Sequence, residues 1–257
     1  MLKLLFLEGP AYAGKTTFLN QLPTGKGIHK LVEASEFLGG DSNFPEAPHD
    51  VASMVYCSYF FSFMENKRLK SLGHLADDTE TLVVADRFTP LSSLIFYFLR
   101  YKGGFISRSD YLIGIQLSAA IFRHNLRLPA IPSRLKFLLF DVSSEAEFSK
   151  RLPRGARNAD FNSWQNFQLL EKAYTSLLPA DAARVINGGY DARDLEIGWV
   201  NRPTLLDELL HPANFLFGDL VGSTLMPCNL NDNVIYKYIS KREISAIEHE
   251  IESLAIQ

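Results

Sequence analysis

Cysteine is scarce in this 257-residue sequence, which contains only Cys57 and Cys228. Two cysteines are too few for a disulfide framework or a cysteine-rich metal cluster, so we expect a reducing compartment, with the cytoplasm as the default location. The chain also lacks an excess of basic residues, because 26 Lys and Arg stand against 29 Asp and Glu. A binder of nucleic acid polymers needs such an excess to neutralise phosphates, so we do not expect a nucleic acid partner.

Long apolar runs are also missing. The apolar run after Lys3 has only four residues, and the run at 92–101 is interrupted by Arg100. Neither is long enough for a membrane span or the core of a signal peptide, so we expect no membrane partner. What the sequence does have is 47% hydrophobic residues with a net charge of −3, which excludes disorder as the dominant state and predicts a globular fold.

Short apolar segments recur through the first two thirds of the chain, separated by stretches long enough to hold crossover helices. They lie at residues 2–8, 29–34, 81–86, 134–142 and 183–187. Several are continuously apolar rather than alternating, which is typical of parallel strands that are buried on both faces. The pattern predicts a three-layer α/β fold around a mostly parallel sheet of about five strands.

The pattern changes after Asn187, where Gly, Pro and Asn are scattered without strand–helix alternation. We therefore expect one domain at 1–189 and a C-terminal appendage at 190–257, whose role the sequence does not reveal. The appendage ends in an amphipathic helix, since Ser240 and Glu243 have the spacing of a capping box. An apolar stripe follows at Ile244, Ile247, Ile251 and Leu254. We expect this stripe to pack in a core rather than to bind a partner.

The most specific motif is GPAYAGKT at Gly9–Thr16, which matches G-x-x-x-x-G-K-[ST] and lies between an apolar strand and a helix start. Glycines let backbone N–H groups converge on one anion, and the helix N-terminus adds partial positive charge. The motif predicts that Lys15 reaches the β- and γ-phosphates of a nucleotide and that the Thr16 hydroxyl binds Mg²⁺. The alternative is an accidental glycine-rich turn.

Other parts of the sequence narrow the type of nucleotide-binding protein. No N-K-x-D run is present, so nothing points to a guanine-specific GTPase. The chain is also short for a motor or transporter ATPase, which favours a small-molecule phosphotransferase with ATP and Mg²⁺ as cofactors. We expect six residues to hold ATP, namely Gly9, Ala13, Gly14, Lys15, Thr16 and Thr17.

An Asp–Arg pair follows the strand at 81–86, at the sheet edge where open α/β folds bind ligands. Asp86 is a candidate to bind Mg²⁺ together with Thr16 or to meet the acceptor, and Arg87 a candidate to neutralise phosphate charge. A capping salt bridge at a strand end is the alternative. Glu33 ends another strand segment and is a candidate general base for an attacking hydroxyl, or else a capping or surface residue.

A basic cluster occupies residues 150–157 and includes Arg151, Arg154 and Arg157. In a chain of net negative charge, it suits a lid that stabilises a transferring phosphoryl group and excludes water. The alternative is a solvated basic helix face. Contact with RNA or DNA is less favoured, because no aromatic residues are interleaved with the cations.

Together these motifs resemble the thymidylate kinase and deoxynucleoside kinase group of P-loop kinases. The resemblance covers residues 2–187 through four ordered features. They are Phe6-Leu7-Glu8-Gly9 before the loop, Asp86-Arg87 with Ser92, the R-x-x-R-G-x-R run at Arg151, Arg154 and Arg157, and Tyr174. The resemblance implies a P-loop NTPase fold and transfer of the γ-phosphate of ATP to a nucleoside or nucleoside monophosphate. It also implies the roles given above for Lys15, Glu33, Asp86, Arg87 and the three lid arginines.

The chain departs from these kinases on the acceptor side. Ala11-Tyr12-Ala13 replaces the D-G-A of thymidylate kinases, so Tyr12 stands where glycine is usual, and the segment 58–69 lacks a base-reading Gln. Aromatic residues of that region either stack the acceptor base or pack in the core: Tyr56, Tyr59, Phe60 and Phe63. A kinase for a non-nucleotide metabolite and an ATP-binding regulator remain alternatives. Kinases of this group are often homodimers, but no interface can be read from the sequence.

Overall fold

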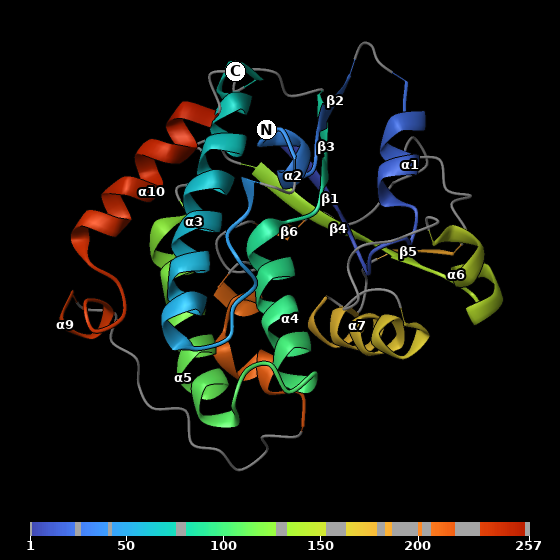
Figure 1. Ribbon diagram of the computed structural model, residues 1–257. Coiled ribbons are helices and arrows are strands. Elements are labelled where there is room, and N and C mark those ends of the chain that lie inside the picture. Colours follow the sequence, from blue (N-terminus) through green and yellow to red (C-terminus); the bar gives the residue numbers. More distant parts are fainter. Residues whose placement is uncertain are drawn as a thin grey trace. The chain divides into compact units, whose positions relative to one another are not determined.

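The computed structural model describes residues 2–23, 27–40, 43–75, 81–126, 133–152, 163–178, 183–186, 200–201, 207–218 and 232–254. The chain divides into two compact units, each assembled from three separate segments (Figure 1). The first, which we call the sheet unit, comprises Met1–Glu33, Leu75–Phe88 and Ile131–Leu205. The second, the helical unit, comprises Ala34–His74, Thr89–Ala130 and Leu206–Gln257. This division differs from the boundary expected at residue 189, because residues 206–257 join helices from the middle of the chain.

The sheet unit is built on parallel strands in the order β2-β3-β1-β4-β5. Their bounds are β1 Leu2–Glu8, β2 Ile28–Leu31, β3 Leu82–Asp86, β4 Ser133–Asp141 and β5 Ala183–Ile186. A short strand, β6 at Val200–Asn201, pairs antiparallel with β4. In the parallel register Leu7 lies opposite Asp86, so the carboxyl ends of β1 and β3 meet at one edge. The expected α/β fold with a parallel sheet is confirmed.

The sheet unit contains three helices in its described residues, two of which begin after a capping serine. They are α1 Lys15–Gln21, α6 Glu145–Arg151 and α7 Trp164–Leu177. Ser144 and Ser163 cap α6 and α7, because each serine oxygen accepts a hydrogen bond from the backbone N–H three residues later. Apolar side chains of α1, α6 and α7 pack with those of the strands in one core, whose members include Leu5, Leu7, Phe18, Val84, Leu138, Phe140, Phe148 and Phe167.

The helical unit contains the longest helices of the described chain. Its elements are α2 Ala34–Phe37, α3 Val51–Lys70, most of η2 Ser71–Leu75, α4 Thr89–Lys102, α5 Arg108–Asn125, η5 Pro212–Leu216, α9 Asp232–Ile235 and α10 Lys241–Leu254. Asp50 and Ser53 form a reciprocal capping box that starts α3. Helices α3 and α5 lie against each other, and a Cβ at Gly114 of α5 would collide with the Met54 side chain of α3.

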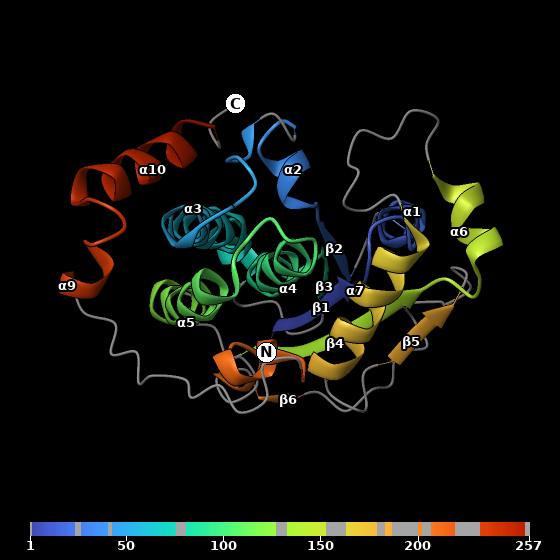
Figure 2. The same cartoon turned by 60° about the horizontal axis from the view of Figure 1, so that its bottom comes forward.

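Helix α10 packs against α3, and the two lie side by side in Figure 2. The predicted capping box at its start is confirmed: the Ser240 N–H donates to Glu243 Oε2 at 2.7 Å, and the Glu243 N–H donates to Ser240 Oγ at 3.2 Å. Ile247 and Ile251 are buried in the core of the helical unit, as the apolar stripe predicted. The side chain of Leu254 lies outside the described residues.

Searched over the residues that the structure describes, no helix combines the length and the apolar character required to cross a membrane.

Candidate functional site: a phosphate loop and the adjoining strand ends

The loop between β1 and α1 needs glycine at both of its ends. Gly9 has φ +126° and Gly14 has φ +101°, which are backbone conformations that other residues rarely adopt. At Gly9 a Cβ would also collide with the carbonyl oxygen of Phe140 in β4. The motif glycines are therefore required by the fold itself, and the backbone between them is shaped into a tight loop at the start of α1.

Lys15 folds back over this loop. Its ammonium group donates to the carbonyl oxygens of Gly9 at 3.0 Å and Pro10 at 2.7 Å, and the residue is only 4% exposed. The pKa of Lys15 is lowered from 10.5 to about 8, first by burial and then by the positive charge of Arg87, which together outweigh the opposing effect of nearby carboxylates. The cation is thus held at the loop by neutral carbonyls, which an anionic ligand would outcompete.

Thr16 and Asp86 are brought together from different elements. The Thr16 hydroxyl donates to Asp86 Oδ2 at 2.7 Å, which joins the first turn of α1 to the end of β3. Asp86 is fully buried, and the parallel register of β1 and β3 places it beside the loop. A hydroxyl and a carboxylate oxygen are ligands that suit Mg²⁺, which usually takes one or two protein ligands and fills its shell with water and phosphate oxygens. These residues therefore fit the expected metal.

No larger metal cluster competes with that pair: across the described ranges, no group of three or more His, Cys, Asp or Glu side chains is arranged to hold a metal ion. Asp141, the carboxylate at the end of β4, has Oδ1 accepting a hydrogen bond from the backbone N–H of Val142. Its carboxylate caps the chain that leaves β4, whereas Asp86 contacts the loop helix.

The backbone turns sharply just after Asp86. Arg87 has φ +64°, and its N–H donates to the carbonyl of Leu7 at 3.0 Å. The next N–H, that of Phe88, donates to Oε1 of the buried Glu8 at 2.6 Å. A left-handed arginine is a strained conformation that persists only where its surroundings enforce it, and such residues cluster at functional sites. The Leu7 carbonyl and the Glu8 carboxylate, the latter without a predicted role, hold the two N–H groups of this turn.

The side chain of Arg87 is fixed from two directions. Its Nε lies 2.8 Å from Glu33 Oε1, and its Nη1 donates to the Tyr174 hydroxyl of α7 at 3.2 Å. Burial acts to lower the pKa of Arg87, but Tyr174, Glu33, Asp86 and Glu8 outweigh it and raise the pKa above its usual value. The guanidinium is therefore a fixed, permanent cation. Tyr174 has no predicted role in binding, and the only sequence signal for it is an aromatic residue in the helix after the basic cluster.

Arg151 contacts the loop from α6. Its Nη1 donates to the carbonyl of Ala13 at 3.0 Å, and its Nε pairs with Glu147 Oε1 at 3.2 Å. This is the one predicted lid arginine within the described residues, since Arg154 and Arg157 lie outside them. The structure therefore places Arg151 at the loop.

The structure thus gathers most of the predicted site residues around one loop of the sheet unit. Direct contacts link Gly9, Ala13, Lys15, Thr16, Glu33, Asp86, Arg87 and Arg151 to one another or to the loop backbone. Gly14 lies in the same loop, and Thr17 is exposed on α1.

The four aromatic residues considered for base stacking belong to the core of the helical unit instead. Tyr59 and Phe60 are buried in that core, and Tyr56 and Phe63 pack against it. Their contacts are those of core side chains, which was one of the two alternatives for them.

Compared with known proteins, the chain matches no protein-family model and no curated protein.

Proposed function

We propose that this chain is an ATP- and Mg²⁺-dependent phosphotransferase with a P-loop NTPase fold, acting on a nucleoside or nucleoside monophosphate. The observation that carries the proposal is the hydrogen bond between Thr16 and Asp86. It joins the hydroxyl of the G-x-x-x-x-G-K-[ST] motif to a buried carboxylate from another strand, beside a lysine folded over the loop. An accidental glycine-rich turn has no reason to collect these three groups.

Each group has a distinct task in the proposed reaction. The loop backbone and Lys15 bind the β- and γ-phosphates, and Thr16 and Asp86 hold the metal ion. Bound there, Mg²⁺ supplies positive charge that neutralises the phosphate oxygens as ADP departs. Arg87 and Arg151 add fixed cations at the acceptor side and at the loop. Catalysis of this kind depends on positioning and electrostatic stabilisation rather than on covalent chemistry by the protein.

In the transfer step, an oxygen of the acceptor attacks the γ-phosphorus while the bond to the β–γ bridging oxygen breaks and ADP leaves. A hydroxyl acceptor must also lose its proton, and Glu33 is the candidate to take it. Its carboxylate lies 2.8 Å from the guanidinium of Arg87, which places the candidate base beside the cation assigned to the acceptor side. A phosphate acceptor needs no base, and Arg87 then contributes charge neutralisation.

The test is ADP release with ATP and Mg²⁺ against a panel of nucleosides and nucleoside monophosphates, with a control that lacks an acceptor. We expect acceptor-dependent turnover that Lys15→Ala reduces on the order of 10³-fold, because the variant removes a charge aimed at the transferring group. Lys172→Ala is the matched control, since Lys172 is exposed on α7.

Full activity of the Lys15→Ala variant would contradict the proposal. ATP binding without turnover for any nucleoside or nucleotide would favour the other two candidates, a kinase for a non-nucleotide metabolite or an ATP-binding regulator.

A further inference from the structure

Tyr12 is an unusual residue for the middle of a phosphate loop. Its backbone has φ +64°, in the left-handed region where a bulky side chain is disfavoured. Glycine would adopt this conformation without strain, so the backbone alone gives no reason for a tyrosine. The reason must lie in what the side chain contacts.

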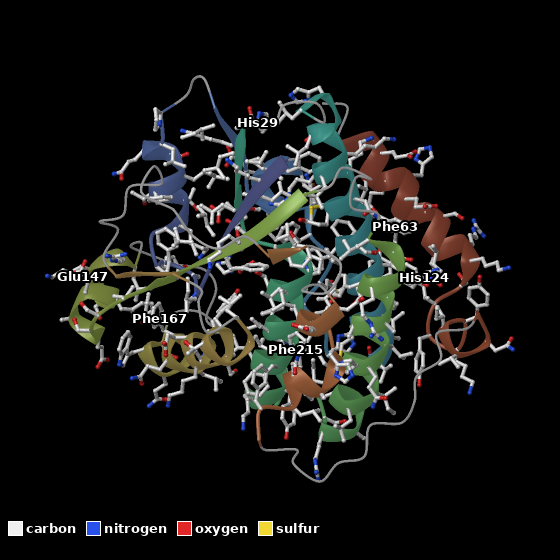
Figure 3. The ribbon with its side chains drawn as sticks, turned by 180° about the vertical axis from the view of Figure 1, so that it is seen from behind. His29, Phe63, His124, Glu147, Phe167 and Phe215 are labelled. Atoms are coloured by element: carbon white, nitrogen blue, oxygen red, sulfur yellow. The ribbon has the colours of Figure 1, made fainter. Side chains whose placement is uncertain are left out.

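The ring of Tyr12 packs against α6. It meets Phe148 edge to face, with ring centroids 6.3 Å apart and planes at 67°. Phe148 is 1% exposed and is held in turn by α7, because its ring lies 5.7 Å from Trp164 and 5.0 Å from Phe167. Figure 3 labels Phe167 on α7 and Glu147 on α6, the two helices that this aromatic cluster joins.

Arg151 lies three residues after Phe148, so the two side chains share one side of α6. Its Nη1 donates to the Ala13 carbonyl, and a Cβ built at Gly14 would lie 3.1 Å from the same nitrogen. Glu147, one turn earlier, pairs with its Nε. Helix α6 therefore contacts the loop at Tyr12 through an aromatic ring and at Ala13 through a guanidinium that also lies close to Gly14.

We propose that Tyr12 is a positioning residue, whose ring fixes α6 on the phosphate loop and so holds the Arg151 guanidinium at the rim of the anion site. This inference rests on the proposed function, since it assigns the arginine to the phosphates of bound ATP. The strain of a left-handed tyrosine is retained because glycine at this position would release α6. Tyr12 itself has no contact with the nucleotide in this account.

The test is equilibrium binding of ATP with Mg²⁺ to the full chain, which needs no acceptor, in a double-mutant cycle. The variants are Tyr12→Gly, Arg151→Ala and the two combined, with Tyr12→Phe as the conservative variant that keeps the ring. We expect Tyr12→Gly and Arg151→Ala each to weaken ATP binding about tenfold, the effect of one charge-assisted hydrogen bond. The combined variant should bind no more weakly than Arg151→Ala, and Tyr12→Phe should bind like the wild type.

A second measurement separates positioning from general destabilisation. In nucleotide-free protein, amide hydrogen exchange over residues 145–152 should rise in Tyr12→Gly but not in Tyr12→Phe, while both variants remain folded by thermal unfolding. Multiplicative losses in the combined variant would overturn the role of Tyr12, as would unchanged ATP affinity in Tyr12→Gly, and either result would leave the proposed function intact. Failure of the wild type to bind ATP would overturn both proposals together.

Discussion

The sheet unit and the helical unit both bury charged side chains, but they pair them differently. In the helical unit Glu65 and Arg68 are fully buried 3.0 Å apart, and both come from one turn of α3. In the sheet unit the hydrogen-bond partners are distant in the sequence. The partner of Asp86 is 70 positions away, that of Glu8 is 80 positions away and that of Arg87 is 87 positions away. The first arrangement is local to a helix, whereas the second requires the whole sheet.

This difference separates a structural charge pair from a candidate site. A buried ion pair within one helix gives no indication of a ligand, and breaking it lowers mainly the free energy of unfolding. Charged groups that converge from several strand ends onto a glycine-lined loop are held in place by the fold and are directed at one point. We therefore expect substitutions in the helical unit to change stability and substitutions in the sheet unit to change activity.

The largest expected effect is on stability, for Arg68→Met. The variant leaves Glu65 buried without its partner, which should lower the free energy of unfolding by about 3–5 kcal/mol. Chemical denaturation measures this change, and the double variant Glu65→Leu/Arg68→Met should recover much of the loss. Phosphotransfer per folded molecule should stay near the wild-type rate. A selective loss of that rate would contradict the expectation that substitutions in the helical unit change stability rather than activity.

Asp86→Asn should have the opposite profile. The variant keeps the shape of a buried residue but removes the charge that meets Thr16, so we expect turnover to fall on the order of 10²–10³-fold. The free energy of unfolding should fall less than in Arg68→Met, since the amide still accepts the threonine hydrogen bond and Arg87 keeps Glu33 as a partner. Steady-state rates across a range of Mg²⁺ concentrations measure the effect, and Asp207→Asn, at an exposed position, is the control.

The third prediction concerns the pH dependence of the free energy of unfolding, which follows from the burial of the Lys15 ammonium away from water. Its pKa in the folded chain is about 8, below the usual 10.5, so between these values the unfolded chain binds more protons than the folded one. Stability must then rise with pH across this window. Relative to Lys15→Met, the wild type should gain up to about 3 kcal/mol between pH 7 and pH 10.5. Denaturation of both proteins at the two pH values measures it, and a constant gap would show that Lys15 titrates normally.

The smallest expected effect is that of Tyr174→Phe. The variant removes the hydroxyl that accepts from Arg87 Nη1, and we expect kcat/KM to fall about tenfold through loss of one hydrogen bond to a charged group. ATP affinity should not change, because Arg87 is assigned to the acceptor side. Tyr236→Phe, at an exposed position, is the matched control. Equal losses of ATP affinity and of kcat/KM would place Arg87 on the nucleotide instead.

Much of the sheet unit could be predicted from the sequence. Each of the five apolar segments overlaps a parallel strand, and the continuously apolar ones have the pattern that a sheet buried on both faces requires. The glycine loop was equally predictable, because the G-x-x-x-x-G-K-[ST] motif is a local pattern and the positive φ angles of Gly9 and Gly14 are backbone conformations that favour glycine. The capping box at Ser240 was also recognisable, since capping depends on residues three positions apart.

Contacts between distant segments could not be predicted from the sequence. The sequence marked Glu33, Asp86 and Arg87 as separate strand-end residues, but their mutual distances depend on strand order and register. The place of α10 in the core of the helical unit likewise depends on which helix its apolar stripe meets, and periodicity does not specify a partner.

The sequence by itself therefore determined the strands, the glycine loop and the identity of the charged groups, because backbone conformation and apolar periodicity are local properties. Only the tertiary structure decided that Thr16 bonds to Asp86, that Tyr174 holds Arg87 and that Tyr12 packs on Phe148. The residues of these pairs are far apart in the sequence, from 70 positions for Thr16 and Asp86 to 136 positions for Tyr12 and Phe148. At such separations, contacts are set by how strands and helices pack, which is a property of the whole sheet.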